Sequence, residues 1–231
     1  MAAISPYQEL HILKHQPIFP NMLLPERVNQ RPQGFVEPCQ PTKAVKPPSG
    51  PGWVHEIKHD GFRLLVRREG PRVRCFTRCG HDWSDRFPAI VEAVSRLKPQ
   101  SFLIDGEAVV FRSDGVSDFD ALRIGRRAHE VTMVAFDLLE LQGDDLRKQP
   151  LFNRKQRLAR VLAGGPEAIV YSEHITHDGP TVFEHACKLG LEGIVSKRLD
   201  APYRSGPVKT WLKSKNAFSE AVRREREEDW S

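Results

Sequence analysis

The spacing of apolar residues along the chain changes near residue 53. Residues 1–50 are rich in proline, lack a regular alternation of apolar and polar positions, and end in Lys-Pro-Pro-Ser-Gly. Such a composition is typical of an extended, partly disordered arm. From Trp53 onward, alternating positions predict antiparallel strands joined by hairpins over residues 53–70 and, after Gly70-Pro71, over 73–78.

Later segments show either the alternating apolar positions of a strand or the apolar spacing of one helical face. We predict a pair of short strands over residues 101–111, interrupted at Asp105-Gly106, a buried strand over 131–141, and strands over 169–175, 192–198 and 210–215. Helical spacing predicts helices over residues 87–97 with Asp85 as N-cap, over 153–163 ending at Gly164-Gly165, over 180–189, and a solvated charged helix over 218–229. The sum is an α+β domain with mainly antiparallel sheets flanked by helices.

Composition narrows the class of protein. The chain has 231 residues, of which 39% are hydrophobic and 28% are charged, as in ordinary globular proteins. No apolar run approaches the roughly 20 residues of a membrane helix, and the first residues lack the pattern of a secretory signal. We therefore expect a cytoplasmic protein without membrane contact. Its four cysteines are expected to be reduced thiols.

The net charge of +5 is modest, but the basic residues are unevenly placed. Six arginines fall within residues 63–78, and six lysines and arginines fall within residues 197–215. Two such clusters suit a polyanion such as a nucleoside triphosphate or a DNA backbone.

Lys58 is the candidate nucleophile, in the segment Glu-Ile-Lys-His-Asp-Gly-Phe-Arg that covers residues 56–63. A lysine attacks only when it is unprotonated, which desolvation or neighbouring cations favour. Carboxylates, an aromatic ring and further lysines recur near later predicted strands, in residues 105–107, 136–137, 192–197 and 211–215. In the last segment, Lys213 and Lys215 point to the same face of the strand.

These five segments, in this order, resemble nucleotidyltransferase motifs I, III, IIIa, IV and V of ATP-dependent DNA ligases. Residues 77–83 (TRCGHDW) resemble the additional motif Ia, and EGIVSKR, YRSG and WLKSK are similar to the ligase domain of bacterial ligase D. The resemblance implies the nucleotidyltransferase (ATP-grasp-like ligase adenylation) fold. It divides the chain into an N-terminal arm over residues 1–34, an adenylation domain over 35–216 and a charged tail over 217–231.

The resemblance also implies a role for each matching residue. Lys58 would form a lysyl-AMP bond with ATP, and Glu192 would help to hold Mg²⁺ or Mn²⁺. Lys213 and Lys215 would stabilise the charge that develops on the α-phosphate. The remaining nucleotide contacts would be Glu56 to the adenine amino group, Arg63 and Arg78 to ribose and phosphate, Glu107 to a ribose hydroxyl, and Phe136 and Ile194 to the two faces of the base.

The sequence departs from the ligase pattern at two places. Pro207 stands where a basic residue usually follows the glycine of YRSG. Full ligases also continue into an OB-fold domain, for which the 16 residues from Asn216 to Ser231 are too few. The leading hypothesis is AMP transfer to a 5′-phosphate of nicked or broken double-stranded DNA, with a DNA-end-joining partner protein for sealing. The alternatives are RNA ligation on the same scaffold and a weakly catalytic, DNA-end-binding ligase remnant.

Overall fold

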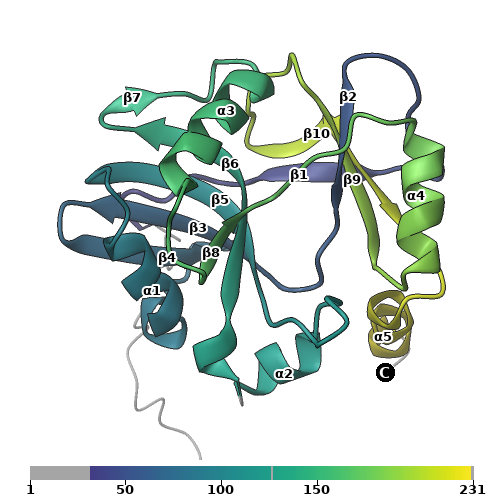
Figure 1. The fold of residues 1–231 in the computed structure, drawn as a ribbon, viewed down its shortest axis with the longest axis horizontal. Coiled ribbons are helices and arrows are strands. Elements are labelled where there is room, and N and C mark those ends of the chain that lie inside the picture. The colour runs from purple at the N-terminus through teal and green to yellow at the C-terminus, as the bar shows by residue number, and fades with distance from the viewer. Residues whose placement is uncertain (1–31, 126, 230–231) are drawn as a thin grey trace, which may run out of the picture. The chain divides into compact units, whose positions relative to one another are not determined.

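In the computed structural model, the described residues, 32–125 and 127–229, form two β-sheets with helices beside them (Figure 1). The four-stranded sheet has the order β1 (Cys39–Lys43), β10 (Gly206–Lys215), β9 (Gly193–Arg198), β2 (Trp53–Ile57). The six-stranded sheet has the order β4 (Arg72–Thr77), β3 (Phe62–Glu69), β5 (Ser101–Val109), β6 (Thr132–Leu141), β7 (Asp144–Asp145), with β8 (Ile169–Tyr171) paired to β6. Only β1 with β10 and β6 with β8 pair in parallel, which confirms the α+β fold with mainly antiparallel sheets.

Five α-helices accompany these sheets within the described residues. They are α1 (Pro88–Ser95), α2 (Phe119–Ile124), α3 (Leu151–Leu162), α4 (Gly179–Lys188) and α5 (Glu220–Asp229), and two short 3₁₀ segments lie at Ser84–Arg86 and Ala128–Glu130. The predicted helices over 153–163 and 180–189 are confirmed within two residues at each end. No helix among the described residues is long and apolar enough to cross a membrane.

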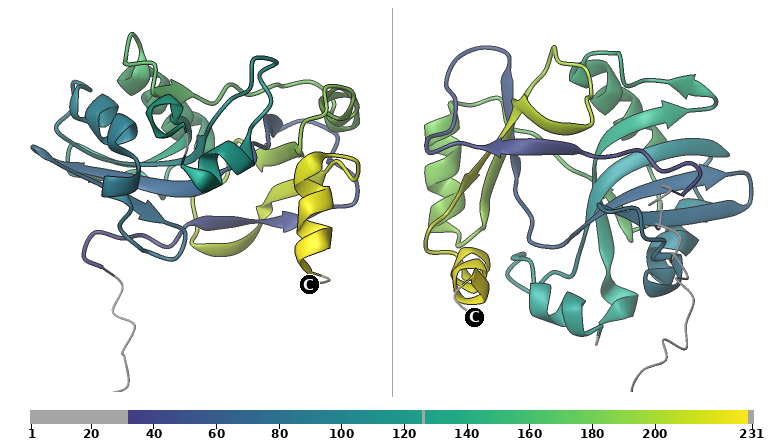
Figure 2. Two further views of the ribbon diagram at one scale, coloured as in Figure 1. Left: turned by 90° about the horizontal axis from the view of Figure 1, so that it is seen from below. Right: turned by 180° about the vertical axis from the view of Figure 1, so that it is seen from behind.

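Three apolar clusters hold the elements together as layers. The largest lies between the six-stranded sheet and helices α1 and α3, where Leu64, Ile104 and Leu158 are fully buried. A second cluster, which includes Leu65, Leu103 and Trp211, lies between the two sheets. A third joins Ile194 of β9 to α4. Figure 2 shows α1 and α3 on one side of the six-stranded sheet and β1, in purple, on the other. The alternation of the β3 and β5 side chains between the two sheet faces supplies the first two clusters.

The predicted hairpin over residues 53–70 is wrong. β2 pairs with β9 in the four-stranded sheet, whereas β3 pairs with β4 and β5 in the other sheet. Residues 58–61 therefore form a crossover between sheets, because β2 and β3 each pair with strands from elsewhere in the chain and not with each other. The second predicted hairpin, at Gly70-Pro71, is confirmed as β3 and β4.

The interruption predicted at Asp105-Gly106 is also wrong, because β5 runs without a break through both residues. Gly106 is needed for close approach and not for a turn. A Cβ atom at this position would lie 2.7 Å from the carbonyl oxygen of Val134 on the neighbouring strand. The glycine therefore lets two strands approach closely, an alternative meaning of glycine within a strand.

Three smaller expectations also need correction. Asp85 lies in a 3₁₀ segment, and the N-cap of α1 is Phe87, followed by a proline at the first helical position. The predicted strand over 169–175 shortens to β8. Helix α5 is not simply solvated, because Ala221 and Val222 are buried and Arg224 forms an ion pair with Asp60. Most of the predicted arm, residues 1–31, lies outside the described residues.

Candidate active site

A cleft of about 220 Å³ lies where the two sheets face each other, and it holds most of the predicted site residues. Its lining comes from β1, β2, β9 and β10 of one sheet and from β3, β5 and β6 of the other. The predicted residues in its wall are Glu56, Lys58, Arg63, Arg78, Glu107, Phe136 and Lys213. Segments far apart in the sequence are therefore brought together by the packing of the two sheets.

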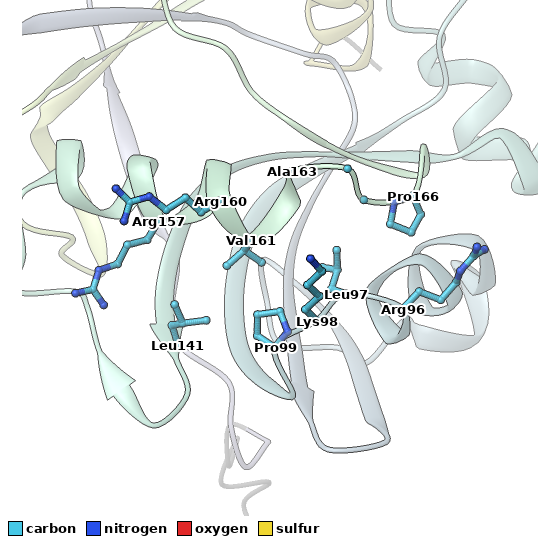
Figure 3. A pocket seen from close by; sticks show the side chains of 12 residues that line it. Arg96, Leu97, Lys98, Pro99, Leu141, Arg157, Arg160, Val161, Ala163 and Pro166 are labelled. Atoms are coloured by element: carbon cyan, nitrogen blue, oxygen red, sulfur yellow. The ribbon is translucent and has the colours of Figure 1, made fainter.

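A larger hollow, of about 730 Å³, lies elsewhere, at the C-terminal ends of α1 and α3 (Figure 3). Arg96, Lys98, Arg157 and Arg160 line it beside apolar side chains such as Val161. It contains none of the predicted site residues and no carboxylate. Its size therefore does not make it the candidate active site, which we assign to the cleft between the sheets.

Lys58 occupies the first position of the crossover between the sheets, directly after β2. Its backbone N–H donates a hydrogen bond to the carbonyl oxygen of Gly193 at 3.0 Å, which fixes the lysine beside β9. Gly61 completes the crossover, because a Cβ atom there would lie 2.2 Å from the carbonyl oxygen of Ala108 on β5. The Lys-x-Asp-Gly pattern thus provides both a reactive amine and the close contact that turns the chain into the second sheet.

Glu192 connects two of the predicted lysines. Its Oε2 atom accepts a hydrogen bond from Lys58 Nζ at 2.6 Å, and its Oε1 atom lies 3.4 Å from Lys215 Nζ. The carboxylate is buried, whereas 22% of the Lys58 side chain remains exposed. Lys58 is therefore held by a carboxylate on one side and is accessible from the cleft on the other. Lys215 therefore shares the Glu192 carboxylate with Lys58, whereas Lys213 lines the cleft.

Glu56 is buried and accepts hydrogen bonds from two lysines. Lys155 Nζ lies 2.7 Å from Oε1, Lys197 Nζ lies 2.7 Å from Oε2, and the Ser172 hydroxyl lies 3.2 Å from Oε2. Burial alone would raise the pKa of Glu56, but Lys197 and Lys155 outweigh burial and lower it. The side chain is thus an ionised hydrogen-bond acceptor in the wall of the cleft.

Arg63 is tied to Asp105 by two hydrogen bonds, from Nε at 2.6 Å and from Nη2 at 2.7 Å. The Tyr203 hydroxyl donates a third hydrogen bond to Asp105, at 2.6 Å. This geometry holds the guanidinium in the cleft wall, with its carbon 4.6 Å from the centroid of the Phe136 ring. Arg63 therefore approaches the cleft as a fixed, partly neutralised cation.

Phe136 points into the cleft because β6 bulges there. Asp105 pairs with Asp137 and Gly106 pairs with Ala135, which leaves Phe136 unpaired between them. Such a bulge redirects a side chain and is common near functional sites. The Lys197 ammonium lies 4.2 Å from the Phe136 ring centroid and 4.0 Å from the Trp211 ring. The aromatic wall of the cleft thus consists of Phe136 and Trp211.

Glu107, on β5, and Arg78, directly after β4, line the same cleft. Glu107 is the register partner of Arg63, so both side chains belong to the cleft face of the six-stranded sheet. Burial raises the pKa of Glu107 to about 7, although Lys58 and Arg63 oppose the shift. This carboxyl group therefore changes its charge near neutral pH.

Ile194 does not line the cleft. Its side chain is fully buried against Val182 and Ala186 of α4, on the opposite face of β9. The next residue, Val195, lines the cleft together with Lys197. The prediction missed this because successive residues of a strand point to opposite faces, so a shift of one residue exchanges core for site.

Several residues in the cleft or directly behind its lining carried no predicted role. Lys197 and Trp211 belong to the recognised segments and share a face with Lys213, so period-two spacing would have identified them. Lys155 lies in α3, outside every motif segment, and only its proximity to Glu56 in the fold reveals it. Asp105 holds Arg63 directly, and Tyr203, 98 positions away from Asp105, holds that carboxylate in turn.

Comparison with known proteins agrees with this geometry. Residues 35–215 match the family described as "ATP dependent DNA ligase domain". The multifunctional non-homologous end joining protein LigD of Pseudomonas aeruginosa is 40% identical over 185 residues, covering 78% of this chain and 22% of that protein. A probable DNA ligase of Dictyoglomus turgidum is 32% identical over 180 residues, covering 71% of this chain and 31% of that protein.

Similarity extends to solved structures. A mycobacterial DNA ligase D complexed with ATP and MES superposes with a TM-score of 0.68 and 30% identity, over 77% of this chain and 59% of that one. The chain spans less than a third of the length of the two relatives named above. The matched region includes the crossover lysine, both sheets and the cleft between them. The chain therefore belongs to the ATP-dependent DNA ligase domain family and has its nucleotidyltransferase fold.

Proposed function

We propose that this chain is a cytoplasmic ATP-dependent DNA ligase-type adenylyltransferase. It forms a covalent lysyl-AMP intermediate at Lys58 and passes AMP to the 5′-phosphate at a DNA nick or end. The observation that carries the proposal is the position of the Lys58 amine, in a cleft between two sheets and within 2.6 Å of the Glu192 carboxylate. A lysine in a surface hairpin would have neither neighbour.

The reaction follows from the groups around this amine. Lys58 Nζ attacks the α-phosphorus of ATP, an N–P bond forms, and the P–O bond to the β-phosphate breaks with release of pyrophosphate. The attacking ammonium must lose protons, and Glu192 is placed to accept one of them. Lys213 and Lys215 stabilise the negative charge that develops on the α-phosphate. An oxygen of the DNA 5′-phosphate then attacks the same phosphorus and breaks the N–P bond.

The cleft walls divide into a base end and a phosphate end. Glu56, Phe136 and Trp211 line the cleft and would contact adenine, and Val195 would take the role that the sequence assigned to Ile194. Glu107 would accept a hydrogen bond from a ribose hydroxyl, and Arg63 and Arg78 would contact ribose and phosphate. Arg63 would do so from its fixed position on Asp105, because that ion pair holds its guanidinium.

A divalent metal ion, Mg²⁺ or Mn²⁺, fits this cleft as a companion of the triphosphate. Glu192 offers carboxylate oxygens beside Lys58, and Mg²⁺ typically binds one or two carboxylates together with phosphates and water. The described residues contain no group of three or more histidine, cysteine, aspartate or glutamate side chains that could hold a metal ion. When bound, the ion would supply positive charge to the phosphates, and Glu192 would hold it.

The DNA substrate follows from the relatives. The Pseudomonas aeruginosa relative is named as an end-joining protein and the Dictyoglomus turgidum relative as a probable DNA ligase. We therefore propose nicked or broken double-stranded DNA as the acceptor of AMP, with an end-joining protein as a partner.

The test of the proposed function is covalent labelling. Incubation with Mg²⁺ and ATP labelled at the α-phosphate should give a labelled band after denaturing electrophoresis, whereas ATP labelled at the γ-phosphate should give none, because pyrophosphate leaves. Addition of nicked DNA with a 5′-phosphate should move the label from protein to DNA, and nicked DNA with a 5′-hydroxyl should not. Absence of the labelled band with folded protein and ATP would refute the adenylyltransferase assignment.

Ionisation of Glu107 should make nucleotide affinity depend on pH. A carboxyl group with a pKa of about 7 is protonated below that pH and cannot accept a ribose hydrogen bond with both oxygens. The affinity ratio of wild type to Glu107→Gln for α,β-methylene-ATP, which Lys58 cannot cleave, should therefore rise about tenfold between pH 6 and pH 8. Taking the ratio cancels ionisation of the nucleotide itself. A ratio that is constant over this range would exclude the ribose contact.

A further inference from the structure

Lys155 is a buried cation that the proposed chemistry does not use. It lies in the middle of α3 with 2% of its side chain exposed, and it does not line the cleft. Its Nζ atom donates hydrogen bonds to Glu56 Oε1 at 2.7 Å and to the carbonyl oxygen of Ser172 at 2.9 Å. Lys155 therefore contacts the cleft only through Glu56 and the Ser172 backbone.

Burial of a lysine at this position of α3 costs desolvation free energy. Of the other buried positions of α3, one holds Arg154, which pairs with Asp137, and the rest hold leucine, as at Leu158. An apolar side chain at position 155 would likewise avoid the desolvation of a charge. Glu56 offsets that cost and raises the pKa of Lys155, although burial acts in the opposite direction. The buried pair therefore points to a role in fixing the state of Glu56.

We propose that Lys155 is a positioning residue that sets the preference for adenine over guanine by holding Glu56 as an oriented, ionised acceptor. This inference rests on the proposed function of the cleft as a nucleotide site. The amino group of adenine donates a hydrogen bond at the position where guanine carries a carbonyl oxygen. A carboxylate accepts from the former and repels the latter, whereas a protonated carboxyl can donate to guanine.

The effect of Lys155 on Glu56 can be distinguished from that of Lys197, the second lysine that donates to this carboxylate. Lys197 lines the cleft and lies 4.2 Å from the Phe136 ring centroid, so its replacement would change contacts with the nucleotide directly. Lys155 stands behind Glu56, on the side away from the cleft lining. A change of nucleobase preference in a Lys155 variant would therefore act through the carboxylate.

The test compares lysyl-nucleotide formation from ATP and from GTP in wild type, Lys155→Met and Lys155→Arg. The ratio of kcat/KM for ATP to that for GTP should fall at least about tenfold in Lys155→Met, chiefly through KM, and should largely recover in Lys155→Arg. Arg160→Met is the matched control, because it removes a cation from the exposed side of α3 and should leave the ratio unchanged.

The pH profile separates positioning from a loss of packing. Removal of one cation should raise the pKa of Glu56, so the ATP preference of Lys155→Met should shrink further as pH falls from 8 to 6, whereas that of wild type should stay constant. If Lys155→Met does not fold, Lys155→Gln retains a hydrogen-bond donor without the charge and should give the same loss of preference.

Two outcomes overturn the inference: an unchanged ATP to GTP ratio in the folded Lys155 variants, or a loss of rate that is equal for both nucleotides. Failure of the proposed function would look different, because wild type would then form no adduct. In that case, equilibrium binding of ATP and GTP to the same proteins still measures the preference that Lys155 is inferred to set.

Discussion

Replacement of Lys58 by alanine should abolish covalent labelling by ATP while the protein remains folded. The amine is the one group of this cleft that is assigned to form the bond to phosphorus, and loss of a nucleophile removes on the order of 10⁵-fold or more of the rate. Truncation removes one of the two cations beside the buried Glu192 carboxylate, but Lys215 still pairs with that carboxylate, so the protein should remain folded. Denaturing electrophoresis after incubation with α-labelled ATP measures the first effect, and circular dichroism measures the second.

Lys58→Arg makes this experiment specific for nucleophilicity. Arginine keeps the positive charge and can still pair with Glu192, but it stays protonated at any pH that the protein tolerates. Both variants should therefore fail to label. Lys188→Ala, on an exposed turn of α4 where the lysine pairs with Glu184, should label like wild type. A labelled band in either Lys58 variant would place the bond on another residue.

Most of the predicted residues that line the cleft could be found from the sequence because they lie in short segments. Each carboxylate or lysine that was assigned a role stands at or beside a strand, and strand spacing tells which neighbours share a face. Lys213 and Lys215 show this most simply, since one strand carries both. The same rule explains the error at Ile194, where the face of β9 was mistaken by one residue.

The arrangement of the sheets could not be predicted in the same way. Pairing of β2 with β9 joins residues that are more than 130 positions apart, and no local pattern distinguishes this pairing from a hairpin with β3. Gly106 was misleading for a related reason, because the atom that excludes a larger side chain belongs to another strand. Lys155 lies outside every recognised segment, and its partner Glu56 is 99 positions away.

Removal of one partner from the buried ion pair of Arg154 with Asp137 is expected to destabilise this domain strongly. Both side chains are fully buried, and Arg154 donates to the two carboxylate oxygens from Nε and Nη2, each at 2.8 Å. Arg154→Met should lower the free energy of unfolding by about 3–5 kcal/mol, because it leaves a buried carboxylate without a counter-charge. Urea unfolding should show a lower midpoint with an unchanged slope.

Asp137→Leu should lower the free energy of unfolding by a similar amount, because it leaves the buried Arg154 guanidinium without its carboxylate partner. The double variant Arg154→Met/Asp137→Leu removes both charges and should be more stable than the sum of the single effects implies, by at least about 1 kcal/mol. Additive losses would mean that the two side chains contribute independently, for instance through the separate hydrogen bond from Arg154 to the Ala201 carbonyl oxygen. Asp137 directly follows Phe136 at the bulge of β6, so this coupling measures how strongly a charge pair fixes the strand beside the aromatic wall of the cleft.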